Sequence, residues 1–292
     1  MTPSHRAEGP PAGSFQAPDW DLGRVRLRPT GRPLVMGIVN LTPDSFWAGS
    51  RTEGVDAAVE HALSVAAAGA DLLDLGAEST RPGAEPVDPG QEQERLLPVL
   101  TALRAATDLP LTVDTRRAAT ARMALEAGAD AVNDISGSAD PDMLPLVAER
   151  DCGLVLMHMK GMPQTMQQAP RYHDVVAEVT GWLTARCRLA QEAGIPADRL
   201  VVDPGIGFGK TLEHNLELMR ALPQVAAGRP LLLGASRKRF IADLTGAAVD
   251  DRLPGSLAAL AAAWQGGATL VRVHDVAASV QFLDVIRGIA GA

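Results

Sequence analysis

The sequence predicts an α/β fold, a (β/α)8 TIM barrel formed by one domain over residues 21–292. Short apolar runs alternate with longer segments whose apolar residues recur every three or four positions, the pattern of strand–helix units around a parallel sheet. Eight such units fit into about 260 residues, the usual size of this barrel. A doubly wound open sheet is the alternative that the same pattern allows.

Residues 1–20 are expected to form a flexible extension, because they are rich in proline, glycine and small polar residues and show no periodicity. The strands that follow read as nearly continuous apolar runs, as expected for strands buried on both faces. The predicted strands are Leu34–Val39, Asp71–Gly76, Leu111–Asp114, Ala131–Asp134, Gly153–Met159, Leu200–Asp203, Pro230–Ser236 and Thr269–His274.

Helices are predicted between these strands. The first spans Asp56–Ala68 and ends at Gly69, because glycine readily adopts the left-handed conformation that terminates helices. Gly128 and Gly194 give the same stop signal before later strands. The last helix, Val276–Ile289, completes the eighth unit.

Composition excludes several classes of partner. The chain has 27 basic and 35 acidic residues, a net charge of −8, so it offers no basic surface for a nucleic-acid backbone. No apolar run approaches the ~20 residues of a membrane helix, and the first residues lack the apolar core of a secretion signal. Cys152 and Cys187 form no CxxC motif. We therefore expect a cytoplasmic protein with neither nucleic-acid nor membrane partners.

Polar residues fall at or just past the predicted strand ends, the end of a barrel that carries chemistry. They are Asp74, Asp114, Asn133, His158, Asp203, Ser236 and His274. A single aspartate there could equally cap the next helix. Asp114, Asn133 and Asp203 together would instead offer acceptors and an amide to a flat heterocycle, which predicts an enzyme. His158 is interpreted as a core histidine bound to a backbone group.

Basic residues follow the second, seventh and eighth strands, and the last two of these are the usual phosphate positions of a barrel. They are Arg81, the run Arg237-Lys238-Arg239, and Arg272 with His274. This placement favours phosphate or pyrophosphate binding over solvated surface charge.

The segment Asp203–Thr211, DPGIGFGKT, superficially resembles a phosphate loop. Pro204 stands where the Walker A motif needs glycine, and Lys210 stands where the dinucleotide motif needs its third glycine. Both motifs are excluded. The glycines are expected to let the backbone approach a ligand beside Asp203, with Phe208 offering an aromatic face.

Eight motifs together resemble the dihydropteroate synthase family. They are GIVNLTPDSF (37–46), DLGAESTRPGA (74–84), VDT (113–115), NDISG (133–137), LMHMKGMPQTMQ (156–167), DPGIGFGKT (203–211), GASRKRFI (234–241) and RVHDV (272–276). The resemblance implies a TIM barrel that condenses 6-hydroxymethyl-7,8-dihydropterin pyrophosphate with p-aminobenzoate. The implied products of this transferase are 7,8-dihydropteroate and pyrophosphate.

The resemblance also implies residue roles. The pterin site comprises Asp114, Asn133, Met157, Asp203 and Lys238. The pyrophosphate site comprises Asn40, Arg272 and His274, and the Asn40 amide oxygen binds Mg²⁺, the implied cofactor. The p-aminobenzoate pocket, where sulfonamide inhibitors compete, comprises Phe46, Thr80, Arg81, Pro82 and Phe208. The catalytic residues are Asp44, Arg81, Asp114, Asp203 and Lys238.

The implied mechanism is dissociative, with pyrophosphate leaving before the arylamine attacks. Loops Leu41–Arg51 and Glu78–Gly90 are expected to exclude water from the cation. Family members are commonly homodimers. Trp47, Ala77 and Arg239 depart from residues frequent in the family.

Two alternatives are a pterin-binding methyltransferase domain and a catalytically silent pterin-binding paralogue. The methyltransferase domain should lack the STRPG and SRK motifs, and this chain has both. The presence of Asn40, Arg81, Lys238, Arg272 and His274 argues against the silent paralogue.

Overall fold

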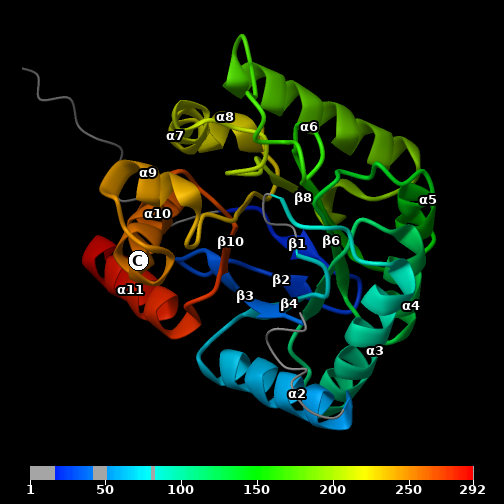
Figure 1. Ribbon diagram of the computed structural model, residues 1–292. Coiled ribbons are helices and arrows are strands. Elements are labelled where there is room, and N and C mark those ends of the chain that lie inside the picture. Colours follow the sequence, from blue (N-terminus) through cyan, green and yellow to red (C-terminus); the bar gives the residue numbers. More distant parts are fainter. Residues whose placement is uncertain (1–16, 42–50, 80–82, 292) are drawn as a thin grey trace, which may run out of the picture.

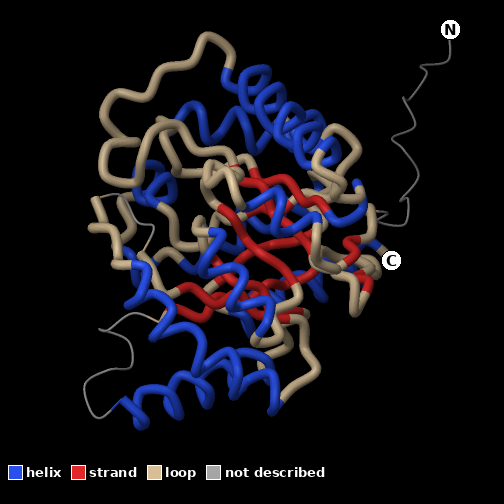
Figure 2. Tube along the Cα trace, turned by 90° about the vertical axis from the view of Figure 1, so that its right-hand side faces the viewer, coloured by secondary structure: helices blue, strands red, loops and turns tan. Residues whose placement is uncertain are grey.

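A computed structural model describes residues 17–41, 51–79 and 83–291 of the chain. Eight parallel strands in these ranges form one sheet in the order β8-β7-β6-β5-β4-β3-β10-β9. A parallel bridge from Val202 to Leu231 joins the two ends of this sheet and closes it. Helices surround the strands (Figures 1 and 2). The predicted TIM barrel is therefore confirmed, and the open sheet is excluded.

The observed strands agree closely with the predicted ones. They are β3 (Leu34–Asn40), β4 (Leu72–Gly76), β5 (Leu111–Asp114), β6 (Ala131–Asp134), β7 (Gly153–Met157), β8 (Leu200–Asp203), β9 (Leu232–Leu233) and β10 (Leu270–Val273). β9 is shorter than predicted, because Pro230 has no N–H to donate and the chain turns after Leu233. β7 ends at Met157, where the chain turns to pack on the loop after β8.

The helices occupy the outer layer (Figure 1). Gly69, Gly128 and Gly194 have φ of 98°, 103° and 102°, which confirms the predicted left-handed stop residues. The helices are α2 (Arg51–Ala67), α3 (Pro89–Ala106), α4 (Ala118–Glu126), α5 (Met143–Ala148), α6 (Val175–Glu192), α7 (Leu212–Arg220), α8 (Leu222–Ala226), α9 (Arg239–Thr245), α10 (Leu253–Gln265) and α11 (Val276–Ala290). Across the described ranges, no helix is long and apolar enough to cross a membrane.

A small antiparallel hairpin, β1 (Trp20–Asp21) and β2 (Arg26–Leu27), closes the end of the barrel opposite the carboxyl ends of the strands. Trp20 is completely buried, and its indole Nε1 donates a hydrogen bond to the Arg199 carbonyl at 2.9 Å. Its side chain belongs to the same apolar cluster as Met36 and Leu72 inside the barrel. The hairpin therefore fills the interior that the short strands leave open.

The predicted boundary of the N-terminal extension needs correction at Trp20. Residues 1–16 lie outside the described residues, but Trp20 begins β1 and belongs to the core. One tryptophan in a segment of polar residues produces no periodic signal, so the pattern missed it. The ordered domain thus begins before residue 21.

We expect Trp20→Ala to lower the free energy of unfolding by about 3–5 kcal/mol, because it leaves a cavity at the base of the barrel. Urea denaturation followed by circular dichroism measures the change. Arg188→Ala, at a side chain on α6 that is 72% exposed, is the control and should change the stability by less than about 0.5 kcal/mol. Equal denaturation midpoints for the two variants would contradict a packing role for the hairpin.

Candidate functional site

The predicted polar residues converge at the carboxyl ends of the strands. In the strand register, Asp114 on β5 pairs with Asn133 on β6, and Met157 on β7 pairs with Asp203 on β8. All four are buried. The carboxyl ends of the parallel strands therefore bring an amide and two carboxylates to one end of the barrel, its mouth, as predicted.

Arg272 on β10 contacts two carboxylates, those of Asp74 on β4 and Asp114 on β5. Its Nε is 2.6 Å from Asp74 Oδ2, and its Nη2 is 2.9 Å from Asp114 Oδ2. Asp74, on β4, is completely buried and also accepts hydrogen bonds from Asn133 Nδ2 at 3.1 Å and Thr112 Oγ1 at 2.5 Å. Asp74 thus orients both Arg272 and Asn133, a role that the sequence did not assign to it.

Asp203, Lys238 and Arg272 meet beside Gly234. Lys238 Nζ, Asp203 Oδ2 and Arg272 Cβ lie 3.8, 3.9 and 3.9 Å from the position that a Cβ on Gly234 would take. Lys238 Nζ also donates to the Ile206 carbonyl and lies 4.6 Å from the centre of the Phe208 ring. Lys238 therefore reaches into the mouth from the end of the loop after β9, beside the loop that follows β8.

Burial shifts the pKa values of these acidic and basic groups toward neutral pH. Burial raises the pKa of Asp114 to about 7, although Arg272 opposes the shift. Burial also raises the pKa of Asp203 against the influence of Lys238, and it lowers the pKa of Lys238 to about 8. Shifts of this kind, caused by desolvation and specific charge partners, are typical of functional sites.

Asn40 and His274 lie on neighbouring strands at the rim of the mouth. Asn40 ends β3 and is half-buried, and His274 follows β10, which pairs with β3. The exposed His274 has its Nδ1 3.1 Å from Ser236 Oγ. The predicted pyrophosphate residues therefore share one side of the barrel with Arg272.

The basic run after β9 divides into three different environments. Arg237 has a φ of 55° and binds Asp275 with Nε at 2.9 Å from Oδ2. Arg239 has a side chain that is 85% exposed, near Asp243. Within the run, Lys238 alone points into the mouth, so the anion-binding interpretation does not extend to Arg237.

Lys210 is buried inside the loop after β8. Its Nζ donates to the carbonyls of Gly205 and Phe208 and lies 3.0 Å from His158 Nδ1. Burial lowers the pKa of His158 to about 3, which leaves the ring neutral and able to accept a hydrogen bond. His158 is a core histidine as predicted, and Lys210 is a ring partner that the sequence did not indicate.

Two glycines of this loop, Gly205 and Gly209, serve protein packing. A Cβ on Gly205 or Gly209 would lie 2.0 Å from the His158 carbonyl oxygen or 2.4 Å from that of Lys160. Both glycines have positive φ, so they allow the loops after β7 and β8 to touch. We expected the glycines of this loop to admit a ligand; the close neighbours of Gly205 and Gly209 are instead backbone atoms, whereas Gly207 has only Lys238 Cδ nearby, at 3.4 Å.

The remaining predicted residues lie outside the described ranges. They are Asp44, Phe46, Thr80, Arg81 and Pro82. Trp47 is also outside these ranges. Within the predicted p-aminobenzoate pocket, Phe208 is the residue that the structure describes.

Comparison with known proteins gives consistent matches. A family model described as pterin binding enzyme matches residues 36–274. Dihydropteroate synthase of Synechocystis sp. is 44% identical over 257 residues, which cover 87% of this chain and 89% of that protein.

Solved structures agree. Dihydropteroate synthase of Xanthomonas albilineans with 4-aminobenzoic acid has a TM-score of 0.87 and 46% identity, covering 95% of this chain and 100% of that one. The Burkholderia cenocepacia dihydropteroate synthase complexed with 7,8-dihydropteroate has a TM-score of 0.85 and 43% identity, covering 94% and 98%.

We expect Asp74→Asn to lower the free energy of unfolding by about 3–5 kcal/mol, because it removes one partner of a buried ion pair with Arg272. Urea denaturation measures the loss. Asp243→Asn makes the same chemical change at a solvent-exposed pair with Arg239 and should cost less than about 1 kcal/mol. A stability of Asp74→Asn equal to that of Asp243→Asn would show that Asp74 does not hold the mouth together.

Proposed function

Because the chain belongs to the dihydropteroate synthases, a family of pterin-binding transferases, we propose that the mouth of its barrel holds both substrates. The reaction joins 6-hydroxymethyl-7,8-dihydropterin pyrophosphate to p-aminobenzoate and releases pyrophosphate. The observation that carries the proposal is the convergence of Asp114, Asn133 and Asp203 with Lys238 and Arg272 at one buried site.

The pterin ring would occupy the buried part of the mouth. Asp114 and Asp203 can accept paired N–H bonds from its 2-aminopyrimidinone edge, and Asn133 supplies both a donor and an acceptor. Lys238 can donate to a ring oxygen or nitrogen, while the buried Met157 packs on the ring. Buried polar groups of this kind reject ligands that leave them without partners, which gives the site its selectivity.

The diphosphate would lie at the rim, between the ends of β3 and β10. The Arg272 guanidinium has five N–H donors, and its bonds to Asp74 and Asp114 use two of them, so three remain for phosphate oxygens. His274 and Asn40 stand on the same side of the mouth. This arrangement supports pyrophosphate binding by Asn40, Arg272 and His274.

Mg²⁺ fits the donors at this rim. Among the described residues, no group of three or more His, Cys, Asp and Glu side chains could hold a metal ion. A magnesium ion commonly keeps several waters and substrate phosphate oxygens, so it needs few protein ligands. The half-buried Asn40 offers one hard amide oxygen beside the diphosphate position. A bound ion would neutralise negative charge that develops on the leaving pyrophosphate.

The proposed reaction begins when the bond between the pterin methylene carbon and the diphosphate oxygen breaks, and the electron pair leaves with pyrophosphate. Arg272 and His274 stabilise the growing negative charge more strongly in the transition state than in the ground state. Asp203 and Asp114 offset the positive charge that spreads into the pterin. The neutral arylamine nitrogen then bonds to the methylene carbon and loses its proton, so no strong base is needed.

The p-aminobenzoate side of the site rests mainly on sequence motifs. Asp44 and Arg81 are proposed to act in catalysis, and Phe46, Thr80, Arg81 and Pro82 to enclose p-aminobenzoate together with Phe208. Sulfonamides, which mimic p-aminobenzoate, are proposed to compete for this pocket.

We also propose a homodimer that functions in the cytoplasm. Leu244, Val249, Val285 and Ile289 are each about half exposed or more, on α9, α11 and the short turn after α9. Exposed apolar side chains on the segments that flank α10 in the chain favour an interface between subunits. Both cysteines are buried free thiols, which suits a reducing compartment.

The purified protein is expected to release pyrophosphate and form 7,8-dihydropteroate only when p-aminobenzoate and Mg²⁺ accompany dihydropterin pyrophosphate. Asp203→Ala should lower kcat/KM at least about tenfold, because one charged hydrogen-bond acceptor is lost. Asp198→Ala, at a half-exposed surface pair with Arg26, should retain full activity. Pterin binding without pyrophosphate release by the wild type would instead identify a silent paralogue.

Binding of 6-hydroxymethyl-7,8-dihydropterin, which lacks the diphosphate, should weaken as the pH falls through about 7. Burial raises the pKa of Asp114 to about 7, so the carboxylate that accepts pterin N–H bonds is present above this pH and lost below it. Calorimetric titrations between about pH 5.5 and 8.5 measure how the affinity falls at low pH. We call this low-pH part of the affinity profile the acid limb. Asp114→Asn should bind weakly throughout that range. A constant wild-type affinity would rule out this role of the ionised carboxylate.

A further inference from the structure

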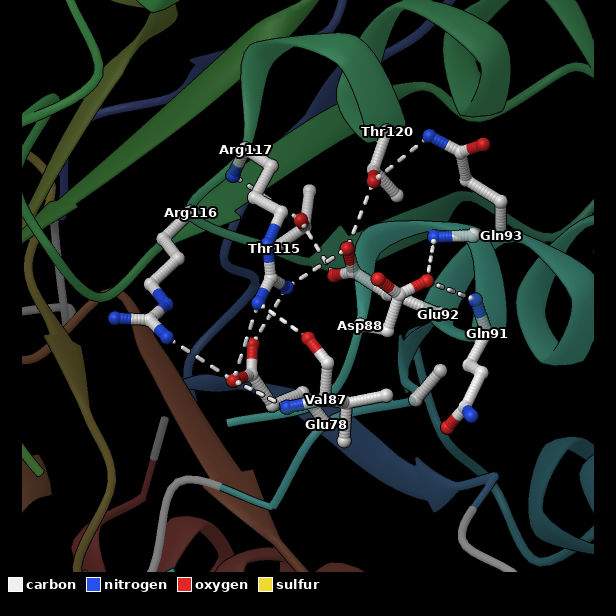
Figure 3. A network of polar contacts seen from close by, with 12 residues as sticks. Glu78, Val87, Asp88, Gln91, Glu92, Gln93, Thr115, Arg116, Arg117 and Thr120 are labelled. Atoms are coloured by element: carbon white, nitrogen blue, oxygen red, sulfur yellow. Dashed lines mark hydrogen bonds and ion pairs between the residues drawn. The ribbon is translucent and has the colours of Figure 1, made fainter. Parts of the chain in front are cut away.

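A buried carboxylate on α3 lies behind the pterin residues. Glu92 is completely buried, and its Oε1 accepts a hydrogen bond from Thr115 Oγ1 at 2.7 Å. Its Oε2 accepts from Thr120 Oγ1 at 2.7 Å and from Arg117 Nη1 at 2.9 Å (Figure 3). Glu92 therefore holds the turn between β5 and α4 against the first turn of α3.

Arg117 extends these contacts to the segment that follows β4. Its Nη1 lies 2.7 Å from Glu78 Oε2, and its Nη2 donates to the Val87 carbonyl at 2.7 Å. Glu78 Oε1 also accepts from Arg116 Nη2 at 3.1 Å and from the Val87 N–H at 3.2 Å. Figure 3 shows that Glu78, Glu92 and Arg117 point toward one another from three separate segments.

The position of this network links it to the site. Thr115, the partner of Glu92, directly follows Asp114 in the chain. Its N–H donates to the Asn133 carbonyl at 3.2 Å, and its Oγ1 accepts from the Arg117 N–H at 3.2 Å. The side chain and backbone of Thr115 are thus fixed on both sides, and this constrains where the Asp114 carboxylate points.

Packing alone does not explain the network. Bringing charged groups out of water is costly, and apolar residues of similar volume often stabilise a fold as well or better. Hydrogen bonds between charged groups impose a defined geometry, which an apolar cluster imposes less strictly. A completely buried glutamate beside the turn that carries Asp114 is therefore better explained by a need for geometric accuracy there.

We propose that Glu92 and Arg117 are positioning residues for the reaction, which fix the turn after β5 so that Asp114 faces the pterin ring. The proposal rests on the proposed function, because it assumes that Asp114 binds pterin. Neither residue is placed in contact with a substrate. Their effect is transmitted through Thr115 and the backbone of the turn.

Charge gives this arrangement a second measurable consequence. The negative charge of Glu92 contributes to the raised pKa of Asp114. Removing that charge lowers the pKa of Asp114, so the acid limb of pterin binding moves to lower pH. The charged groups facing Asp114 are Asp74 on β4, Asp134 on β6, Lys238 after β9, Arg272 on β10 and Glu92 on α3.

The test compares Glu92→Gln and Thr115→Val with the wild type in calorimetric titrations with 6-hydroxymethyl-7,8-dihydropterin across pH. Each variant should weaken binding above the acid limb about fivefold or more, the effect of losing one or more geometry-defining hydrogen bonds. Glu92→Gln should also move the acid limb to lower pH. Thr115→Val, which removes a hydroxyl and no charge, should leave the limb in place.

Glu126→Gln is the matched control, because Glu126 ends α4 and pairs with Arg150 at the exposed surface. Its affinity and acid limb should match those of the wild type. Cooperative unfolding of each variant, followed by circular dichroism, confirms that it is folded.

Wild-type affinity and an unchanged acid limb in a folded Glu92→Gln variant would overturn the positioning role. Should Glu92→Gln fail to fold, unchanged affinity in Thr115→Val would overturn it equally. Asp114→Asn separates this outcome from failure of the proposed function. If Asp114→Asn binds dihydropterin like the wild type, the pterin role of Asp114 itself is wrong; if it loses affinity while the other two variants do not, only the positioning proposal fails.

Discussion

The bonds of Arg272 to Asp74 and Asp114 are the constraint on which the rest of the mouth depends. A guanidinium inside a barrel is stable only with carboxylate partners, and these two come from β4 and β5, the second and third strands from β10 in the sheet order. Asp74 also binds Asn133, so the position of the amide follows from the same ion pair. Two acids, one amide and one cation are therefore set relative to one another before any ligand binds.

The barrel makes this arrangement possible because the apolar side chains that fill its interior lie away from the mouth. The Trp20 hairpin fills the opposite end with apolar side chains, which leaves the carboxyl ends of the strands free for polar residues. Lys210, Gly205 and Gly209 lock the loops after β7 and β8 together. Apolar packing thus fills the end of the barrel that carries the hairpin, and the proposed chemistry is concentrated at the other end.

Local patterns predicted the barrel well, since β5, β6 and β8 have the predicted bounds and the stop glycines have left-handed φ. Strand ends also identified Asp114, Asn133 and Asp203, because parallel strands bring their carboxyl ends together. The sequence could not reveal that Arg272 pairs with Asp74, which lies 198 residues away. Glu92 resembled an ordinary acidic residue in the first turn of a helix, and its burial follows only from how α3 packs. Trp20 was missed because a two-residue strand has no period.

The central claim is that Asp114, Asn133 and Asp203 form one site for the pterin ring, held in place by Arg272 and Lys238. A crystal structure of the protein with 6-hydroxymethyl-7,8-dihydropterin tests it most directly. The account predicts that the 2-aminopyrimidinone edge lies within hydrogen-bonding distance of all three residues, with Lys238 beside the ring and the hydroxymethyl group directed toward Arg272 and His274. A pterin ring bound elsewhere, or bound at the mouth without contact to Asp114 and Asp203, would contradict the claim.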